Sequence, residues 1–66
     1  MREKLIALIE RETGVPVTET TLIENLGIDS LDFIALIQDI KYEIGPVSLD
    51  KATNANTVGD LLAAIG

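Results

Sequence analysis

Two glycine and proline stops divide this 66-residue chain and limit what it can fold into. Gly14 and Pro16 follow one segment of periodic apolar residues, and Gly45 and Pro46 follow a second one. A glycine just after the last periodic residue is typical of a helix C-cap, and a nearby proline cannot continue the helix. The chain is therefore expected to form short helices, and no segment shows the alternation of a strand.

The apolar periodicity on either side of these stops predicts three main helices, over about residues 2–13, 30–44 and 57–65. At the start of the third, Thr57 and Asp60 have the spacing of a capping pair. The second is the best defined, because its apolar residues recur at helical offsets over its whole length.

The remaining segments predict a short helix and a long loop. Residues 48–53 read as one helical turn capped by Ser48, and residues 15–29 form a long first loop with enough apolar side chains to pack on the helices. We therefore expect an all-α fold, with residues 1–66 as a single domain. Its architecture is a small four-helix bundle of three main helices plus one short helix.

Composition excludes several kinds of function. The chain has no cysteine and no histidine, which argues against zinc, haem and Ser-His-Asp chemistry, so no metal site is expected. A core this small leaves little stability for a strained catalytic cleft, which argues against an enzyme. The longest apolar runs are five residues, too short for membrane insertion, and the N-terminus does not resemble a secretory signal. These features favour a cytoplasmic setting.

The charge distribution indicates the kind of partner. The formal net charge of -6 lies in residues 19–66, which carry eight acidic groups and two basic ones. Such a surface repels phosphate backbones and attracts basic patches, so we expect basic-faced protein partners and no nucleic acid. A monomer is the expected state for so small and charged a domain.

One candidate site stands out, at the predicted start of the second helix. Ser30 follows Asp29 where the long loop becomes a helix, so its hydroxyl is expected to be exposed beside unpaired backbone N–H groups. Such a helix start favours a phosphate group, and a phosphodiester on Ser30 would be stabilised there. The alternative is that Asp29 or Ser30 is only the N-cap, with Asp32 adding a favourable charge in the first turn.

The residues around Ser30 resemble the prosthetic-group signature of the acyl carrier proteins. That signature is an Asp-Ser-Leu at the head of a helix, and here it reads Leu26-Gly27-Ile28-Asp29-Ser30-Leu31. Residues 17–27 are similar to the family's long first loop, and residues 57–65 to its last helix. The resemblance covers nearly the whole chain.

The resemblance implies that Ser30 receives a 4′-phosphopantetheine arm from a phosphopantetheinyl transferase that uses coenzyme A. The thiol of the arm would carry an acyl or aminoacyl group as a thioester between enzymes of lipid, polyketide or related biosynthesis. The chain would then be a carrier and not a catalyst, and its lack of cysteine is explained because the cofactor supplies the sulfur. Asp29 and Leu31 would flank the attachment site, and Asp29 would also pair with the transferase.

The second helix is expected to have a core face and a separate apolar stripe beside acids. Such a stripe suits a docking surface, and its candidate partner contacts are Leu31, Asp32, Ile34, Ala35, Gln38 and Tyr42. The alternative is that Leu31 and Ile34 are scattered surface residues or pack under the long loop. Candidate residues for an acyl-chain pocket between helices are Phe33, Ile37, Ile40, Leu61 and Leu62, with simple core packing as the alternative role.

The departures from the family bear on the pathway. Carrier proteins of fatty-acid synthesis usually have glutamates where this chain has Ala35, Lys41 and Tyr42, which suggests a dedicated pathway with its own enzymes. The stretch over residues 45–50 also looks shortened.

Two other classes of function are alternatives to the carrier. The first is an acidic helical interaction module without a prosthetic group. The second is a small enzyme or calcium-binding protein. It is disfavoured because Asp29 and Asp32 lack the ligand spacing of a calcium loop and no base accompanies Ser30.

Overall fold

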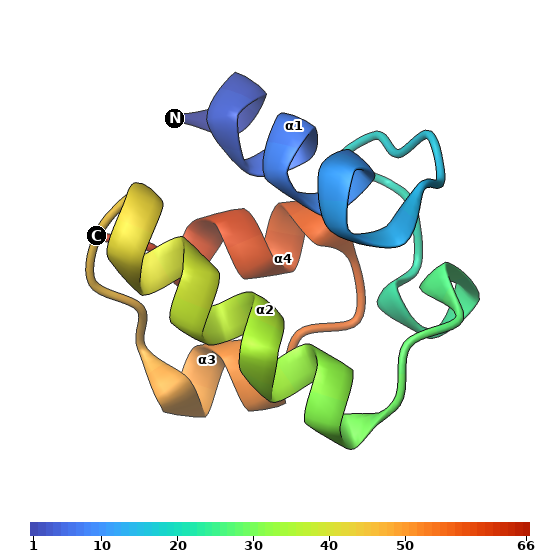
Figure 1. The fold of residues 1–66 in the computed structure, drawn as a ribbon. Helices are drawn as coiled ribbons and strands as arrows, with labels where there is room; N and C mark the ends of the chain where they lie inside the picture. The colour runs from blue at the N-terminus through green and yellow to red at the C-terminus, as the bar shows by residue number, and fades with distance from the viewer.

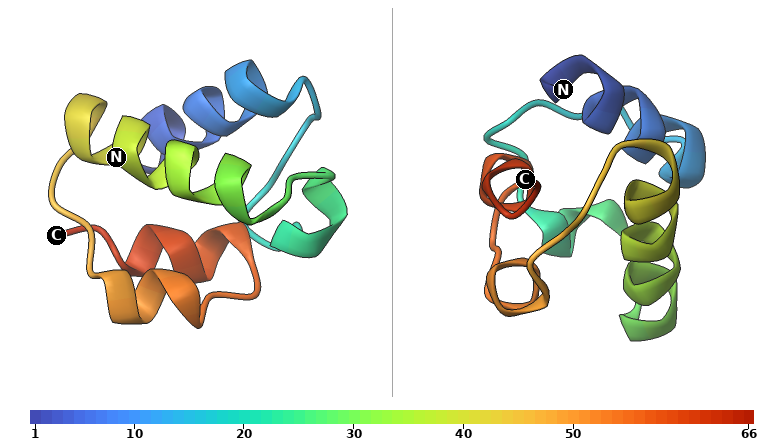
Figure 2. Two further views of the ribbon diagram at one scale, coloured as in Figure 1. Left: turned by 60° about the horizontal axis from the view of Figure 1, so that its bottom comes forward. Right: turned by 90° about the vertical axis from the view of Figure 1, so that its left-hand side faces the viewer.

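The computed structural model covers residues 1–66, and its regular elements are all helices, with no β-strand. Along the chain its elements are α1 (Arg2–Thr13), the 3₁₀ turn η1 (Ile23–Leu26), α2 (Ser30–Glu43), α3 (Leu49–Thr53) and α4 (Val58–Ala63) (Figure 1). The predicted all-α architecture, with a long first loop and a short helix before the last one, is confirmed. Figure 2 (right) shows the four helices placed around one centre, with α1 and α2 on one side and α3 and α4 on the other.

The first two helices end at the predicted stops. Gly14 adopts a left-handed conformation with φ 71°, and its N–H donates to the Glu10 carbonyl at 2.8 Å. Glycine adopts this conformation without strain, whereas a residue with a Cβ atom would be strained there. At the end of α2, the amides of Ile44 and Gly45 both donate to the Ile40 carbonyl.

The last helix starts as predicted but is shorter than predicted. Thr57 caps α4, and Thr57 and Asp60 form a reciprocal capping box. The predicted end at Ile65 is wrong, because α4 ends at Ala63 and the chain then tightens into i→i+3 bonds. Ile65 instead pairs with Val47 in an isolated antiparallel bridge, which draws the chain end away from the helix axis.

All thirteen buried residues are apolar and form one core cluster. The most deeply buried side chains come from three helices, and each has a relative exposure below 2%: Leu5, Ile9, Ile40, Val58 and Leu61. Burial of this apolar surface is the main source of stability for so small a chain.

The long first loop is tied to the start of α4. Val17 and Leu26 are buried in the core, and Ile23 and Ile28 pack against it, as the apolar content of this loop predicted. The Ile23 amide donates to the Asn56 carbonyl at 2.8 Å, and Leu22 and Thr57 form an antiparallel bridge. The loop therefore holds the chain entering α2 in a defined place.

Candidate functional site

Asp29, and not Ser30, is the N-cap of α2. The Asp29 Oδ1 atom accepts a hydrogen bond from the Asp32 amide at 2.9 Å, and its carbonyl accepts from the Phe33 amide at 2.9 Å. Ser30 is the first residue of the helix and is exposed. Because Asp29 does the capping, the Ser30 hydroxyl makes no hydrogen bond within the chain and is available for reaction.

The backbone beside the Ser30 hydroxyl offers hydrogen-bond donors. The amides of Ser30 and Leu31 donate to no protein atom, as expected for the first turn of a helix. They point with the positive end of the helix dipole toward the loop. A phosphodiester on Ser30 Oγ therefore fits this helix start, although the carboxylates of Asp29 and Asp32 flank it.

Gly27 shapes the approach to this site. It ends η1 in the left-handed conformation, with φ 72°. A side chain here would be strained, because L-residues rarely adopt this backbone conformation. The glycine of the Leu-Gly-x-Asp-Ser-Leu string thus turns the chain from η1 toward the cap of α2.

An open groove of about 580 Å³ begins at Ser30. It lies between η1, the first turns of α2, and the end of α3 with Ala55 just beyond it. Its lining combines apolar side chains with a polar mouth and consists of Ile23, Glu24, Ile28, Asp29, Ser30, Phe33, Ile34, Ala52, Thr53 and Ala55. A volume in this range is typical of small-molecule sites.

The predicted acyl-pocket residues do not lie together on this groove. Phe33 lines it, whereas Ile37, Ile40 and Leu61 are buried in the core and Leu62 is partly buried against the core. Neither the groove nor the other main hollows are lined by these last four residues, so their pocket role stays a prediction. The groove residues that the sequence reasoning missed come from other elements: Ile23 from η1, Ala52 from α3, and Ala55 after it.

The predicted partner surface is exposed. Leu31, Ile34 and Tyr42 are 77%, 54% and 91% exposed, and the three polar or small members of the set are exposed as well. Leu31 and Ile34 therefore do not pack under the long loop. Ile34 also borders the groove, so the exposed stripe and the groove adjoin each other.

Two further predictions concern membranes and metals. None of the helices has the length and apolar character that a bilayer span requires. No group of three or more acidic side chains is placed to hold a metal ion.

Comparisons with known proteins show which family the chain belongs to. A family model described as "Phosphopantetheine attachment site" matches residues 3–65. An acyl carrier protein of Azobacteroides pseudotrichonymphae is 39% identical over 69 residues, which covers 96% of this chain and 81% of the relative. The chain belongs to the acyl carrier protein family. A second acyl carrier protein, from Thermotoga maritima, is 37% identical over 68 residues and covers 94% of this chain and 83% of the relative.

Membership of the acyl carrier protein family establishes the general role. The chain is a carrier and not an enzyme, and the cofactor of the family is 4′-phosphopantetheine. Its partners include a phosphopantetheinyl transferase and acyl-handling enzymes. No solved structure matches the chain.

Proposed function

We propose that Ser30 is the attachment residue, and that the chain shuttles an acyl or aminoacyl group as a thioester on the arm bound there. The observation that carries this proposal is the division of roles at the start of α2. Asp29 satisfies the cap, so the Ser30 Oγ atom lies exposed, without a partner, at the mouth of an apolar groove.

The residues around Ser30 suit a covalently held phosphodiester. Ser30 Oγ would hold the phosphorus, and the Ser30 and Leu31 amides are the nearest unpaired donors. When bound, the arm supplies the thiol that this cysteine-free chain lacks. Asp29 keeps the helix start in place and presents a carboxylate beside the reacting hydroxyl.

We assign the groove, and not the closed core, as the place where the arm or the first part of its cargo is sheltered. Ile23, Phe33 and Ala55 supply apolar surface there, within reach of a chain attached at Ser30. Ala52 and Ala55 are small, so they leave the space that larger side chains would fill. The groove is open along its length, which allows a cargo to enter and leave without unfolding of the helices.

The partner enzymes would dock on α2. Leu31 and Ile34 offer exposed apolar contacts, and Asp32 offers a carboxylate for a basic patch on the partner. Ala35, Gln38 and Tyr42 extend this surface along the helix. With Ala35, Lys41 and Tyr42 in place of acids, the surface suits a dedicated set of enzymes in lipid, polyketide or related biosynthesis. A cytoplasmic, monomeric carrier is consistent with this role.

The test is the intact mass of the protein before and after incubation with coenzyme A and a broad-specificity phosphopantetheinyl transferase. We expect the wild type to gain one phosphopantetheinyl group and Ser30→Ala to gain none. Circular dichroism should show that Ser30→Ala keeps its fold, because the Ser30 hydroxyl makes no hydrogen bond in the chain.

A second acyl carrier protein, treated in the same way, serves as a control for transferase activity. If that control is modified and the folded wild type is not, the attachment proposal is wrong. The interaction module without a prosthetic group would then be the better interpretation.

A further inference from the structure

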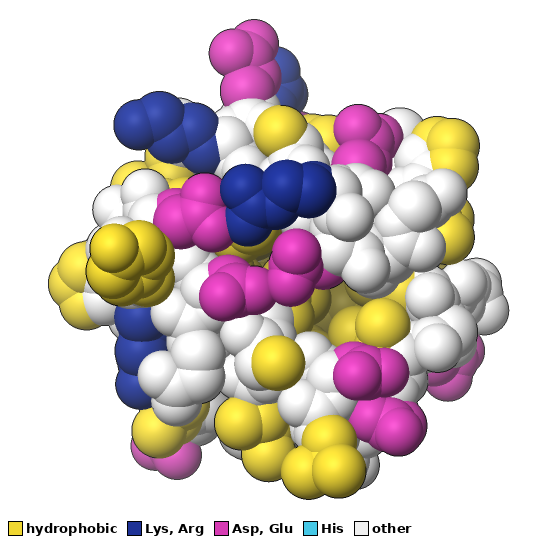
Figure 3. Space-filling model, in the orientation of Figure 1, with side chains coloured by type: hydrophobic (Ala, Val, Ile, Leu, Met, Phe, Trp, Pro, Cys, Tyr) yellow, Lys and Arg dark blue, Asp and Glu magenta, His cyan; other side chains and the backbone are white.

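A second hollow lies between α1 and α2, on the opposite flank of α2 from the groove. Its volume is about 160 Å³, and its lining consists of Glu12, Thr13, Ile28, Asp32, Ala35 and Leu36. Figure 3 shows it near the centre of the face, as a depression with an apolar floor (yellow) and acidic side chains (magenta) at its rim.

The size and lining of this hollow suit a single side chain. Small-molecule sites usually start at about 300 Å³, so this hollow is too small for an acyl chain or a pantetheine arm. Ile28, Ala35 and Leu36 supply the apolar floor, and Glu12 and Asp32 supply the only charges in its lining. Arginine and lysine side chains complement this lining, because their apolar stem can contact the floor and their cationic head can reach the carboxylates.

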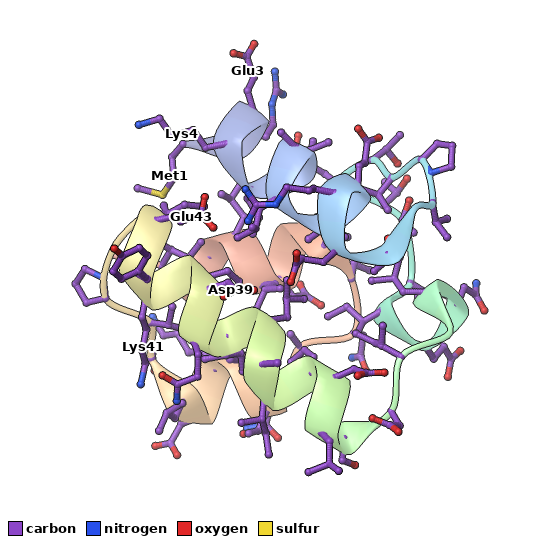
Figure 4. The ribbon with its side chains drawn as sticks, viewed as in Figure 1. Met1, Glu3, Lys4, Asp39, Lys41 and Glu43 are labelled. Carbon is purple, nitrogen blue, oxygen red and sulfur yellow. The ribbon has the colours of Figure 1, made fainter.

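The carboxylates at the rim are paired weakly or not at all within the chain. The Asp32 carboxylate makes no hydrogen bond or ion pair. Glu12 forms an ion pair with the Nε atom of Arg11, at 3.6 Å, while the two terminal nitrogens of Arg11 bind Glu43. Figure 4 shows Asp39 and Glu43 on the side of α2 that faces α1, so Asp39 adds a further carboxylate between these two helices. Lys41 lies on the other side of α2.

The surroundings of Glu12 indicate a local excess of negative charge. The pKa of Glu12 is raised, mainly by the neighbouring Asp39 carboxyl group, and desolvation adds to this. The one nearby cation, Arg11, lowers the pKa of Glu12 by less than these causes raise it. A cation from outside the chain would therefore be favourable at this rim.

We propose that this hollow binds one basic side chain, arginine or lysine, of the enzyme that acts on Ser30. Asp32 lies in the same helical turn as Ser30, so a partner that reaches the serine also covers the hollow. The inference rests on the proposed function for the identity of the partner, and it adds Glu12 of α1 to a docking surface otherwise made by α2. It also gives the partner a pocket for an anchoring side chain, the kind of contact that dominates many interfaces.

The first test compares two isosteric changes on α1, using kcat/KM for modification by the transferase. We expect Glu12→Gln to lower kcat/KM about twofold to fivefold, the range of a half-exposed ion pair. The matched control, Glu3→Gln, removes the same charge from the far end of α1, where Figure 4 shows Glu3 pointing away from the rest of the chain, and should leave kcat/KM unchanged. Equal kcat/KM values for Glu12→Gln and the wild type would overturn the inference while the attachment at Ser30 stands.

A double variant tests whether the two rim carboxylates bind the same side chain. Glu12→Gln combined with Asp32→Asn should lower kcat/KM by less than the product of the two single effects. Fully multiplicative effects would show that the carboxylates act independently and would contradict a shared side chain. Glu12→Gln should not reduce thermal stability, because it removes a like charge from beside Asp39.

The second test needs no partner enzyme. We expect n-butylguanidinium, titrated into the uniformly labelled protein, to shift the amide resonances of Glu12, Ile28 and Ala35, and to do so less in Glu12→Gln. Shifts with Mg²⁺ and none with n-butylguanidinium would identify a cation site without side-chain recognition and would overturn the inference. If no transferase modifies the wild type, the proposed function fails and this titration alone decides the role of the hollow.

Discussion

The starts of α2 and α4 use the same capping chemistry, but the first backbone amides are all paired at α4 and partly unpaired at α2. At α4, the Thr57 side chain accepts from the Asp60 amide, and the Asp60 carboxylate accepts from the amides of Asn56 and Thr57. Backbone carbonyls of the first loop accept from the amides of Val58 and Gly59. At α2, the Asp29 side chain and carbonyl accept from Asp32 and Phe33, and the two amides before them have no partner.

This difference separates stability from function. The start of α4 is closed, since every amide there has a partner and Val58 is buried. The start of α2 is open, since its serine and its first amides face solvent. Substitutions at α4 should therefore change stability, and substitutions at α2 should change modification and docking.

Truncation of one leucine on each helix should give the largest difference. Leu61 in α4 is 0% exposed and Leu31 in α2 is 77% exposed. We expect Leu61→Ala to lower the free energy of unfolding by about 3 kcal/mol, because it leaves a cavity in the core. Leu31→Ala should change it by less than about 0.5 kcal/mol, and should slow modification by the transferase. Urea unfolding followed by circular dichroism measures both; similar losses for the two variants would contradict the separation.

A smaller effect is expected at Gly59, the second residue of α4. A Cβ atom there would lie 3.1 Å from the Glu19 carbonyl oxygen, which already accepts the Gly59 amide at 2.8 Å. We expect Gly59→Val to cost about 2 kcal/mol through overpacking and a displaced loop. Gly45→Val is the matched control, because a Cβ atom at Gly45 meets nothing within 4 Å. If Gly59→Val and Gly45→Val had the same melting temperature, the first loop would be able to move away from the added side chain without loss of stability.

The smallest effect concerns acid and the two aspartates at these helix starts. The pKa of Asp60 is lowered because the amides of Asn56 and Thr57 donate to its carboxylate. Because the pKa of Asp60 is lower in the folded state, its ionised carboxylate stabilises the fold. This stabilisation is present above the pKa of the unfolded chain, about 3.9, and is lost as pH falls through the pKa of the folded state. Asp60→Asn should therefore be less stable than the wild type at pH 7, and the gap should close between about pH 5 and pH 2.

Asp29→Asn is the matched control for this titration. Asparagine caps a helix about as well as aspartate, so the melting temperature of this variant should stay near that of the wild type at pH 7. A gap between Asp60→Asn and the wild type that is the same at pH 7 and pH 2 would show that the Asp60 charge does not stabilise the fold.

Local features of the sequence predicted most helix boundaries. Gly14 ends α1, Ser48 caps α3, and Thr57 with Asp60 starts α4, because each of these signals acts within one helical turn. The end of α4 was not predictable in this way. It depends on the bridge between Ile65 and Val47, two residues that periodicity cannot relate.

The candidate site was predicted unevenly for a similar reason. The exposed Ser30 and its neighbours follow from the motif and the loop-to-helix boundary. Periodicity also shows that Ile37 and Ile40 face inward, but it does not show where packed helices leave space. The groove owes its shape to small side chains on another element, Ala52 and Ala55, and the role of Glu12 depends on how α1 lies against α2.

The exposure of Tyr42 has a consequence for spectroscopy. Tyr42 is the only tyrosine in a chain without tryptophan, and the residue is 91% exposed on α2. Unfolding therefore changes the surroundings of the ring very little, so its fluorescence is a poor reporter of the folded state. A partner that covers the outer face of α2 would remove water from the same ring. We therefore expect the emission of Tyr42 to respond to such an association and hardly at all to denaturation.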